Sequence, residues 1–280
     1  MTERQDTRWF CIWLVCLGLA WLWNHTFLNL PAFDQIQTAF VHSSLIAVTT
    51  VVISLGLAWS VAIGLYFLER SALAPLAFLV SFLLNLIRSV PQIVGILGGY
   101  VVLTVLLRKG MLPAEWMVLT GMAVVTGVFV FLELADLIRE RIDHYTASDF
   151  VNAMLVCGIP EGRIVTVEIL WKNSLAHILN KLIALLGMTI FLQCSVDFIL
   201  SVGLSTDVSP VNLPITLGSM LARIDSKQDI LAIGHTLTHP FYAPNLVFQH
   251  LQGLTTAFLI VFTLVAVYRI SDGFARRHGL

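Results

Sequence analysis

The sequence predicts an all-α membrane protein with six transmembrane helices, from its composition, its apolar stretches and its distribution of positive charge. Hydrophobic residues make up 58% of the 280 residues and charged residues 12%. A soluble domain is about half apolar and about a quarter charged, so this chain has too few charged side chains to cover a globule in water. Lipid is therefore expected to be most of its solvent. The net charge of −1 gives no basic surface for nucleic acid, which is excluded as a partner.

Six apolar stretches are long enough to cross a hydrocarbon core of about 30 Å. They cover residues 9–23, 45–68, 73–107, 116–137, 175–200 and 246–268. The first is interpreted as a retained span, because no small-residue cleavage site follows it. The third is interrupted at residues 88–91, where Pro91 removes a backbone donor and crowds the preceding turn. In lipid such a break is stable only against protein or water.

Lysine and arginine fall unevenly on the two sides of these spans. Those predicted inside are Arg4, Arg8, Arg70, Arg139, Arg141, Arg163, Lys172, Lys181, Arg269, Arg276 and Arg277. Those predicted outside are Arg108, Lys109, Arg223 and Lys227. The positive-inside rule therefore predicts cytoplasmic termini, a cytoplasmic loop at about 139–173 and an extracytoplasmic loop at about 201–245. No internal repeat is visible, so residues 1–280 are interpreted as one transmembrane domain.

The predicted cytoplasmic loop has the pattern of a short helix, a sharp turn and a second helix. The turn residues are Gly158, Pro160 and Gly162. Apolar side chains recur before the turn at helical spacing, at Phe150, Val151, Met154 and Leu155. This stripe needs a surface to cover it, which is either a protein partner or the membrane interface. An interfacial amphipathic helix without a partner is the alternative interpretation.

This segment resembles the cytoplasmic EAA loop of permeases in ATP-binding-cassette (ABC) importers, in the form found in the dipeptide, oligopeptide and nickel class. The positions that match are Phe150, Val151, Ala153, Gly158, Ile164 and Leu170. The positions that depart are Asn152, Met154 and Trp171, where the family usually has glutamate, alanine and proline. Loss of the glutamate at Asn152 removes a charged group that the family carries within the loop.

Weaker matches extend the resemblance along the chain in the same order. They lie at Asn85, Arg139, residues 196–203, residues 217–221 and residues 271–273. The family's longer segment before its second span, with its Gly-Thr-Asp and Gly-Arg-Asp motifs, is missing. The resemblance is therefore to a divergent member.

The resemblance implies the type I ABC importer membrane-domain fold and a permease subunit that forms half of a translocation pathway. It also implies a bacterial inner-membrane location and several partners: a second homologous permease subunit, two cytoplasmic ATPase subunits and an extracytoplasmic substrate-binding protein. Peptide is the family's usual substrate, with metal chelate and polyamine left open. The chain lacks the G-x-x-x-x-G-K-[ST] phosphate-binding loop, so ATP and Mg²⁺ are expected on the partners. The alternative is a secondary transporter or channel that works without ATPases.

Ionisable and amide side chains inside apolar spans are costly, so they indicate either a pathway or structural pairing. Candidate pathway residues are Asn85, Arg88, Gln193 and Asp197. Structural pairing is the preferred interpretation for Glu133, Asp136 and Lys181.

No enzyme or metal site is predicted. His235 and His239 have metal-binding spacing, but no glutamate makes an H-E-x-x-H motif and Pro240 ends the turn. The four cysteines form no C-x-x-C pair and are interpreted as small buried apolar residues.

Overall fold

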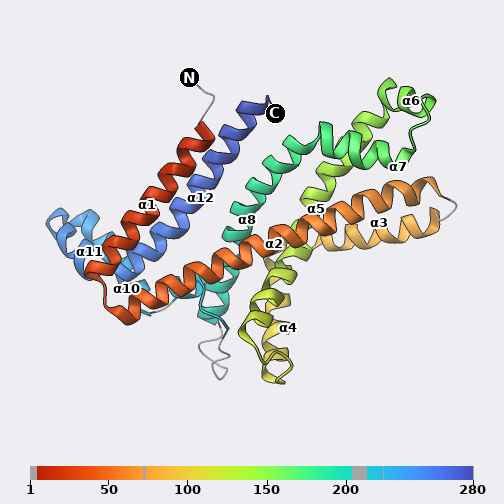
Figure 1. The fold of residues 1–280 in the computed structure, drawn as a ribbon. Coiled ribbons are helices and arrows are strands. Elements are labelled where there is room, and N and C mark those ends of the chain that lie inside the picture. Colours follow the sequence, from red (N-terminus) through yellow and green to blue (C-terminus); the bar gives the residue numbers. More distant parts are fainter. Residues whose placement is uncertain (1–4, 72–73, 204–212, 223, 280) are drawn as a thin grey trace.

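The computed structural model of the chain describes residues 5–71, 74–203, 213–222 and 224–279. Arg4, Arg223 and residues 204–212, which entered the predictions above, lie outside the described residues. The helices are α1 (Gln5–Phe27), α2 (Leu30–Arg70), α3 (Ala74–Ser89), α4 (Gln92–Arg108), α5 (Glu115–Thr146), α6 (Asp149–Val156), α7 (Glu161–Arg163), η1 (Ile164–Asn173), α8 (Leu175–Gly203), α9 (Leu217–Ala222), α10 (Ile224–Thr238), η2 (Pro240–Tyr242), α11 (Ala243–Gln249) and α12 (Leu251–His278). The described residues contain no strand, which confirms the all-α class (Figure 1).

Several of these helices are long and apolar enough to cross a membrane, as the composition predicts. Five of the described helices meet this description, namely α1, α2, α5, α8 and α12. The pair α3 and α4 is a sixth candidate span if its two bent parts are counted together, and the parts are bent by 94°. The predicted break is therefore present, with α3 ending at Ser89 and α4 beginning at Gln92. Pro91 stands immediately before α4, where a missing N–H costs little because the first amides of a helix have no intrahelical acceptor.

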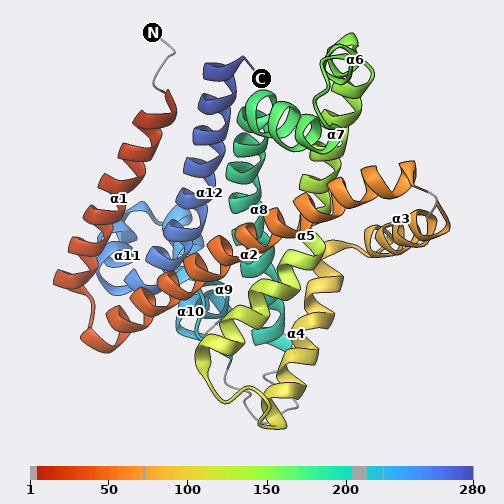
Figure 2. The ribbon, with the colours of Figure 1, turned by 45° about the vertical axis from the view of Figure 1, so that its right-hand side comes forward.

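The second predicted span is much longer than its apolar core suggests. Residues 24–44 were expected to form an outer connection, but α2 already begins at Leu30 and continues for 41 residues. At about 1.5 Å per residue this helix is about 60 Å long, roughly twice the thickness of a hydrocarbon core. Figure 2 shows it crossing the bundle obliquely. The polar residues at its start hid its beginning from a hydropathy argument.

The last predicted span begins later and ends later than its hydropathy indicates. The stretch predicted at 246–268 is divided, because residues up to Gln249 belong to α11 and α12 begins at Leu251. The helix then continues through the basic tail to His278 and is capped by Gly279, whose φ is +65°. Basic side chains in a last helical turn are stabilised by the helix dipole, so the tail remains helical.

The closest helix pair in the centre is α2 with α5, and small and hydroxylated residues make this contact possible. Thr50 Oγ1 donates a hydrogen bond to the carbonyl of Ala123 at 3.2 Å, and Ser54 Oγ donates to the carbonyl of Gly127 at 3.5 Å. A Cβ atom at Gly127 would lie 3.1 Å from the Ile53 side chain. Close approach through small residues and hydroxyl bonds is typical of helices that pack within membranes.

At one edge of the bundle, α1 packs along α12. Trp13 Nε1 donates to Thr263 Oγ1 at 3.2 Å, and Arg277 forms an ion pair with Asp6 at 3.2 Å. Gly273 lets the two helices touch, since a Cβ atom there would lie 2.7 Å from the Asp6 amide nitrogen. The N- and C-terminal helices therefore run side by side, with both chain ends at the same end of the bundle as α6 and α7 (Figures 1 and 2). The connection between α4 and α5 lies at the opposite end.

Candidate functional site

The segment that resembles the EAA loop folds as a helical hairpin of α6, α7 and η1, called here the α6–η1 hairpin (residues 149–173). Gly158 adopts φ +79° after α6, as the turn pattern indicated. The Gly158 amide donates to the Leu155 carbonyl at 2.9 Å and the Ile159 amide donates to the Met154 carbonyl at 3.2 Å. This is the Schellman pattern that ends a helix and needs a left-handed residue, which glycine adopts without steric cost. The predicted order of helix, sharp turn and helix is confirmed.

Burial divides the predicted hairpin residues into an inner and an outer set. Val151, Ile164 and Leu170 are buried in the main core of the chain, so they hold the hairpin in place and are closed to a partner in this conformation. Phe150 is only partly exposed, because its ring lies 5.9 Å from that of Tyr145 and packs on the core. The outer set is exposed and consists of Asn152, Ala153 and Gly158.

The exposed apolar residues of the hairpin coincide with the predicted apolar stripe only at Leu155. Val156, the last residue of α6, is 90% exposed, and Leu155 beside it is 45% exposed. Trp171, at the position where the resembled family has proline, is also exposed on η1. The stripe seen in the sequence is therefore covered in large part by the chain itself, while the tip of α6 presents apolar surface to the outside.

A polar contact that sequence reasoning missed ties the hairpin to α2. Glu161 Oε1 accepts a hydrogen bond from Tyr66 Oη at 2.7 Å and lies 3.4 Å from Nε of Arg70. Beside it, Arg139 of α5 forms an ion pair with Glu69 of α2. Nothing in the sequence links residue 161 to residues 66–70, because the contact depends on where α2 ends.

The second arm of the hairpin is a π-helix over the ten residues of η1. Both the side chain and the backbone of Glu168 are bonded within this arm: the carboxylate pairs with Lys172 at 2.8 Å, and the backbone carbonyl accepts a hydrogen bond from the Asn173 side chain at 2.6 Å. π-Helical turns are rare and are frequently found at functional sites.

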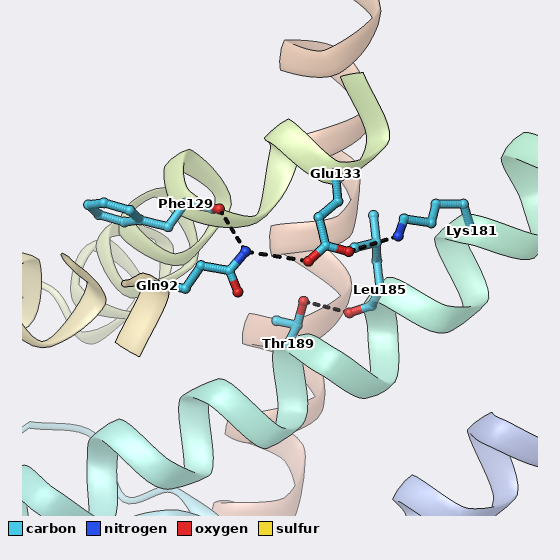
Figure 3. A network of polar contacts seen from close by, with 6 residues as sticks. All are labelled: Gln92, Phe129, Glu133, Lys181, Leu185 and Thr189. Carbon is cyan, nitrogen blue, oxygen red and sulfur yellow. Dashed lines mark hydrogen bonds and ion pairs between the residues drawn. The ribbon is translucent and has the colours of Figure 1, made fainter. Parts of the chain in front are cut away.

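Within the apolar helices, an ion pair joins α5 to α8. Glu133 Oε2 lies 2.7 Å from Lys181 Nζ, and Glu133 Oε1 accepts from the Gln92 side chain at 3.4 Å (Figure 3). Gln92 Nε2 also reaches the Phe129 carbonyl at 3.4 Å, so the first residue of α4 is fastened to α5. The predicted pairing of Lys181 with a carboxylate is confirmed.

A second ion pair stands at the break between α3 and α4. Arg88 lies 2.6 Å from Asp136 of α5 and donates to Asn85 of its own helix at 3.4 Å. Both members of the ion pair are half-exposed on the surface of the chain. Asn85 and Arg88, both candidate pathway residues, thus contact each other, and Asp136, which the sequence assigned to structural pairing, is an additional member.

The other two candidate pathway residues lie elsewhere and are closed off. Gln193 is 0% exposed and Asp197 4% exposed. Asp197 Oδ2 accepts from Thr216 Oγ1 at 2.6 Å, next to α9. Both side chains are therefore closed to solvent in this conformation. Burial by α9 could not be foreseen, because the short apolar segment 217–222 has no periodicity that fixes its position.

The histidine pair forms no metal site within the described residues. The rings of His235 and His239 stack with centroids 4.7 Å apart and planes 13° apart. No group of three or more His, Cys, Asp or Glu residues in the described part of the chain is arranged for a metal ion. The expectation that the cysteines are buried is correct for Cys194 and wrong for Cys11 and Cys157, which are exposed.

Comparison with known proteins adds no family assignment. No protein-family model matches the chain, and no curated protein matches it. Function must therefore be argued from the geometry of the hairpin and of the polar groups within the helices.

Proposed function

We propose that this chain is a permease subunit of a binding-protein-dependent ABC importer, with the type I membrane-domain fold. In this proposal it forms half of a translocation pathway in a bacterial inner membrane, together with a second homologous permease. Two ATPase subunits, which hold ATP and Mg²⁺, dock on the cytoplasmic side, and a substrate-binding protein delivers solute from outside. The observation that carries the proposal is the exposed apolar tip of the α6–η1 hairpin, at the same end of the bundle as both chain termini.

The contacts of the hairpin would pass a movement of a docked partner to the rest of the chain. Because the chain has no phosphate-binding loop, energy from ATP reaches it only through contact with another protein. Val151 anchors α6 in the core, while Glu161 connects α7 to Tyr66 and Arg70 at the end of α2. A displacement of the hairpin is therefore passed to α2, the helix that crosses the whole bundle (Figure 2).

Charge supports the orientation and a place for the pathway. The lysines and arginines predicted to be inside belong to the termini, the hairpin and the helix ends next to it, and under the positive-inside rule this supports a cytoplasmic position for that end. The half-exposed Arg88–Asp136 pair is costly to place against lipid, so it is proposed to face the pathway or the second permease. Peptide is the proposed solute class, with metal chelate and polyamine as the competitors in an uptake assay.

The test uses two exposed apolar residues at different places on the chain. Val156→Asp changes the tip of α6, and Leu237→Asp changes α10, where the side chain is 81% exposed. Both variants should insert and fold as wild type does, because neither side chain packs inside the chain. Val156→Asp should lose the ATPase subunits on affinity purification and lose solute uptake, whereas Leu237→Asp should retain the ATPases.

Phe150 is a poorer probe than its sequence position indicated, because its partial burial couples docking to folding. If Val156→Asp retains stoichiometric ATPases and wild-type uptake, the hairpin is not the coupling element. Uptake by the purified chain without any ATPase would instead support a secondary transporter or channel.

A further inference from the structure

A buried carboxyl group between α8 and α9 remains without a role in the hairpin proposal. Asp197 is almost fully buried inside the single chain, so no second permease or partner reaches it in this conformation. Thr216 Oγ1 donates to one of its oxygens at 2.6 Å. Among the described residues, no lysine, arginine or histidine forms an ion pair with it. A buried charge without a cation or several donors is strongly disfavoured.

The neighbouring amide supplies a second and independent observation. Gln193 lies one helical turn before Asp197, and its amide is close enough to act on the carboxyl group but lies beyond hydrogen-bond distance. Both polar atoms of the Gln193 side chain, Nε2 and Oε1, are buried without a hydrogen-bond partner. Buried amides are nearly always paired, because an unpaired buried polar atom keeps its full desolvation cost. Gln193 Oε1 is therefore a buried acceptor without a donor, one helical turn from the Asp197 carboxyl group.

The groups that face Asp197 bring no positive charge. Tyr100 of α4 and Cys194 of α8 are its titratable neighbours, and both are neutral or negative. The Thr216 hydroxyl bonds the carboxyl group, and the Leu217 amide beside Thr216 donates to the Ser43 hydroxyl of α2 at 2.9 Å. The site is thus polar but uncharged around a carboxyl group.

We propose that Asp197 is an occluded proton-binding site, in which the protonated carboxyl group donates to Gln193 Oε1 while it accepts from Thr216. The added hydrogen gives Gln193 Oε1 a donor and neutralises the negative charge of the buried Asp197 carboxylate. On opening, the O–H bond of the carboxyl group breaks, the proton passes to incoming water and the carboxylate becomes hydrated. The ligand of this site is a proton. Because the site lies between α8 and α9 and not in the α6–η1 hairpin, it is independent of the proposed docking of ATPase subunits.

The position of Gly218 shows what keeps the site closed. A Cβ atom there would lie 2.5 Å from the Cys194 carbonyl oxygen and 2.9 Å from the Asp197 Cβ. Helix α9 therefore sits directly on α8 over the carboxyl group, and only glycine permits that contact. Any movement that lifts α9 admits water to Asp197, so proton release is linked to the opening of this contact.

The test is infrared spectroscopy of the full chain in lipid nanodiscs, which separates the C=O stretch of a carboxylic acid from the bands of a carboxylate. At neutral pH, wild type minus Asp197→Asn should show one protonated-carboxyl band. Wild type minus Asp136→Asn should show only carboxylate bands, since Asp136 is paired with Arg88. If Asp197→Asn removes only carboxylate bands, the proposal is wrong, and sodium-dependent shifts of those bands would assign an alkali cation instead.

Two further variants test closure and folding. Gly218→Ala should convert the Asp197 acid band to carboxylate at neutral pH, whereas Gly234→Ala, whose added Cβ meets nothing within 4 Å, should leave the band unchanged. Asparagine is a neutral isostere of the protonated acid, so Asp197→Asn should fold and melt as wild type does. Misfolding of Asp197→Asn, or an unchanged acid band in Gly218→Ala, would overturn the occluded proton site.

Discussion

Replacing Lys181 with methionine leaves the Glu133 carboxylate in an apolar setting without its cation. The two side chains are 31% and 33% exposed and 2.7 Å apart, and the remaining partner of Glu133 is the Gln92 amide at 3.4 Å. Breaking a fully buried pair costs about 3–5 kcal/mol, and an exposed pair contributes about 0–1 kcal/mol. Because this pair is only partly buried, Lys181→Met should lower the free energy of unfolding by an intermediate amount, about 2–3 kcal/mol. This value is close to the cost of about 2.5–3.5 kcal/mol for inserting a charged residue at the middle of a membrane span.

The assay is unfolding by sodium dodecyl sulfate in mixed micelles, followed by far-UV circular dichroism. The double variant Glu133→Gln/Lys181→Met should recover most of the lost stability, because no charge then remains buried alone. Arg139→Met is the matched control: its pair with Glu69 stands at the end of α2, and the two side chains are 40% and 41% exposed. It should cost about 0–1 kcal/mol. Equal stability of Lys181→Met and wild type would refute the reasoning that this pair is needed.

Two glycine substitutions test the hairpin turn and the contact between the first and last helices. Gly158→Ala should destabilise the α6–η1 hairpin by about 1–2 kcal/mol through the left-handed φ of +79° alone, since an added Cβ meets nothing within 4 Å. Limited proteolysis should then cleave faster between α6 and α7, and an unchanged cleavage rate would contradict the prediction. Gly273→Ala places a Cβ atom 2.7 Å from the Asp6 amide nitrogen, so it should reduce crosslinking of cysteines at positions 13 and 263 by a short thiol-reactive linker. Gly64→Ala, with nothing within 4 Å, should leave that crosslinking intact, and equal crosslinking in both variants would argue against the α1–α12 packing.

The hairpin shows how far sequence patterns reach. The turn at Gly158 and the helices on either side follow from local residue chemistry, so they are predictable. Which apolar side chains face outward is not local: Val151 is buried because α6 packs on α5 and this side chain joins the main core, whereas Val156 lies outside that core and is exposed. An apolar stripe identifies a helix that packs on something, but only tertiary structure shows that the chain itself covers most of this one.

The ion pairs show the same division. A charge inside an apolar stretch must find a partner, so pairing of Lys181 was predictable from the cost of burying it alone. The choice of Glu133, and the choice of Asp136 by Arg88, depends on helix rotation and on the 94° bend between α3 and α4. A proline predicts a break but not its angle, because that angle is set by what the two halves pack against.

The sequence by itself determined that this is an all-helical chain with several spans, that its third span is broken and that residues 149–173 form a hairpin. These features depend on composition, on proline and glycine geometry and on neighbours a few positions apart. Only the tertiary structure decided that α2 extends from Leu30 to Arg70, that Glu161 is tied to α2 and that α9 closes over Asp197. Those contacts join residues far apart in the sequence, and the free energy that selects them comes from burial and pairing in the assembled bundle.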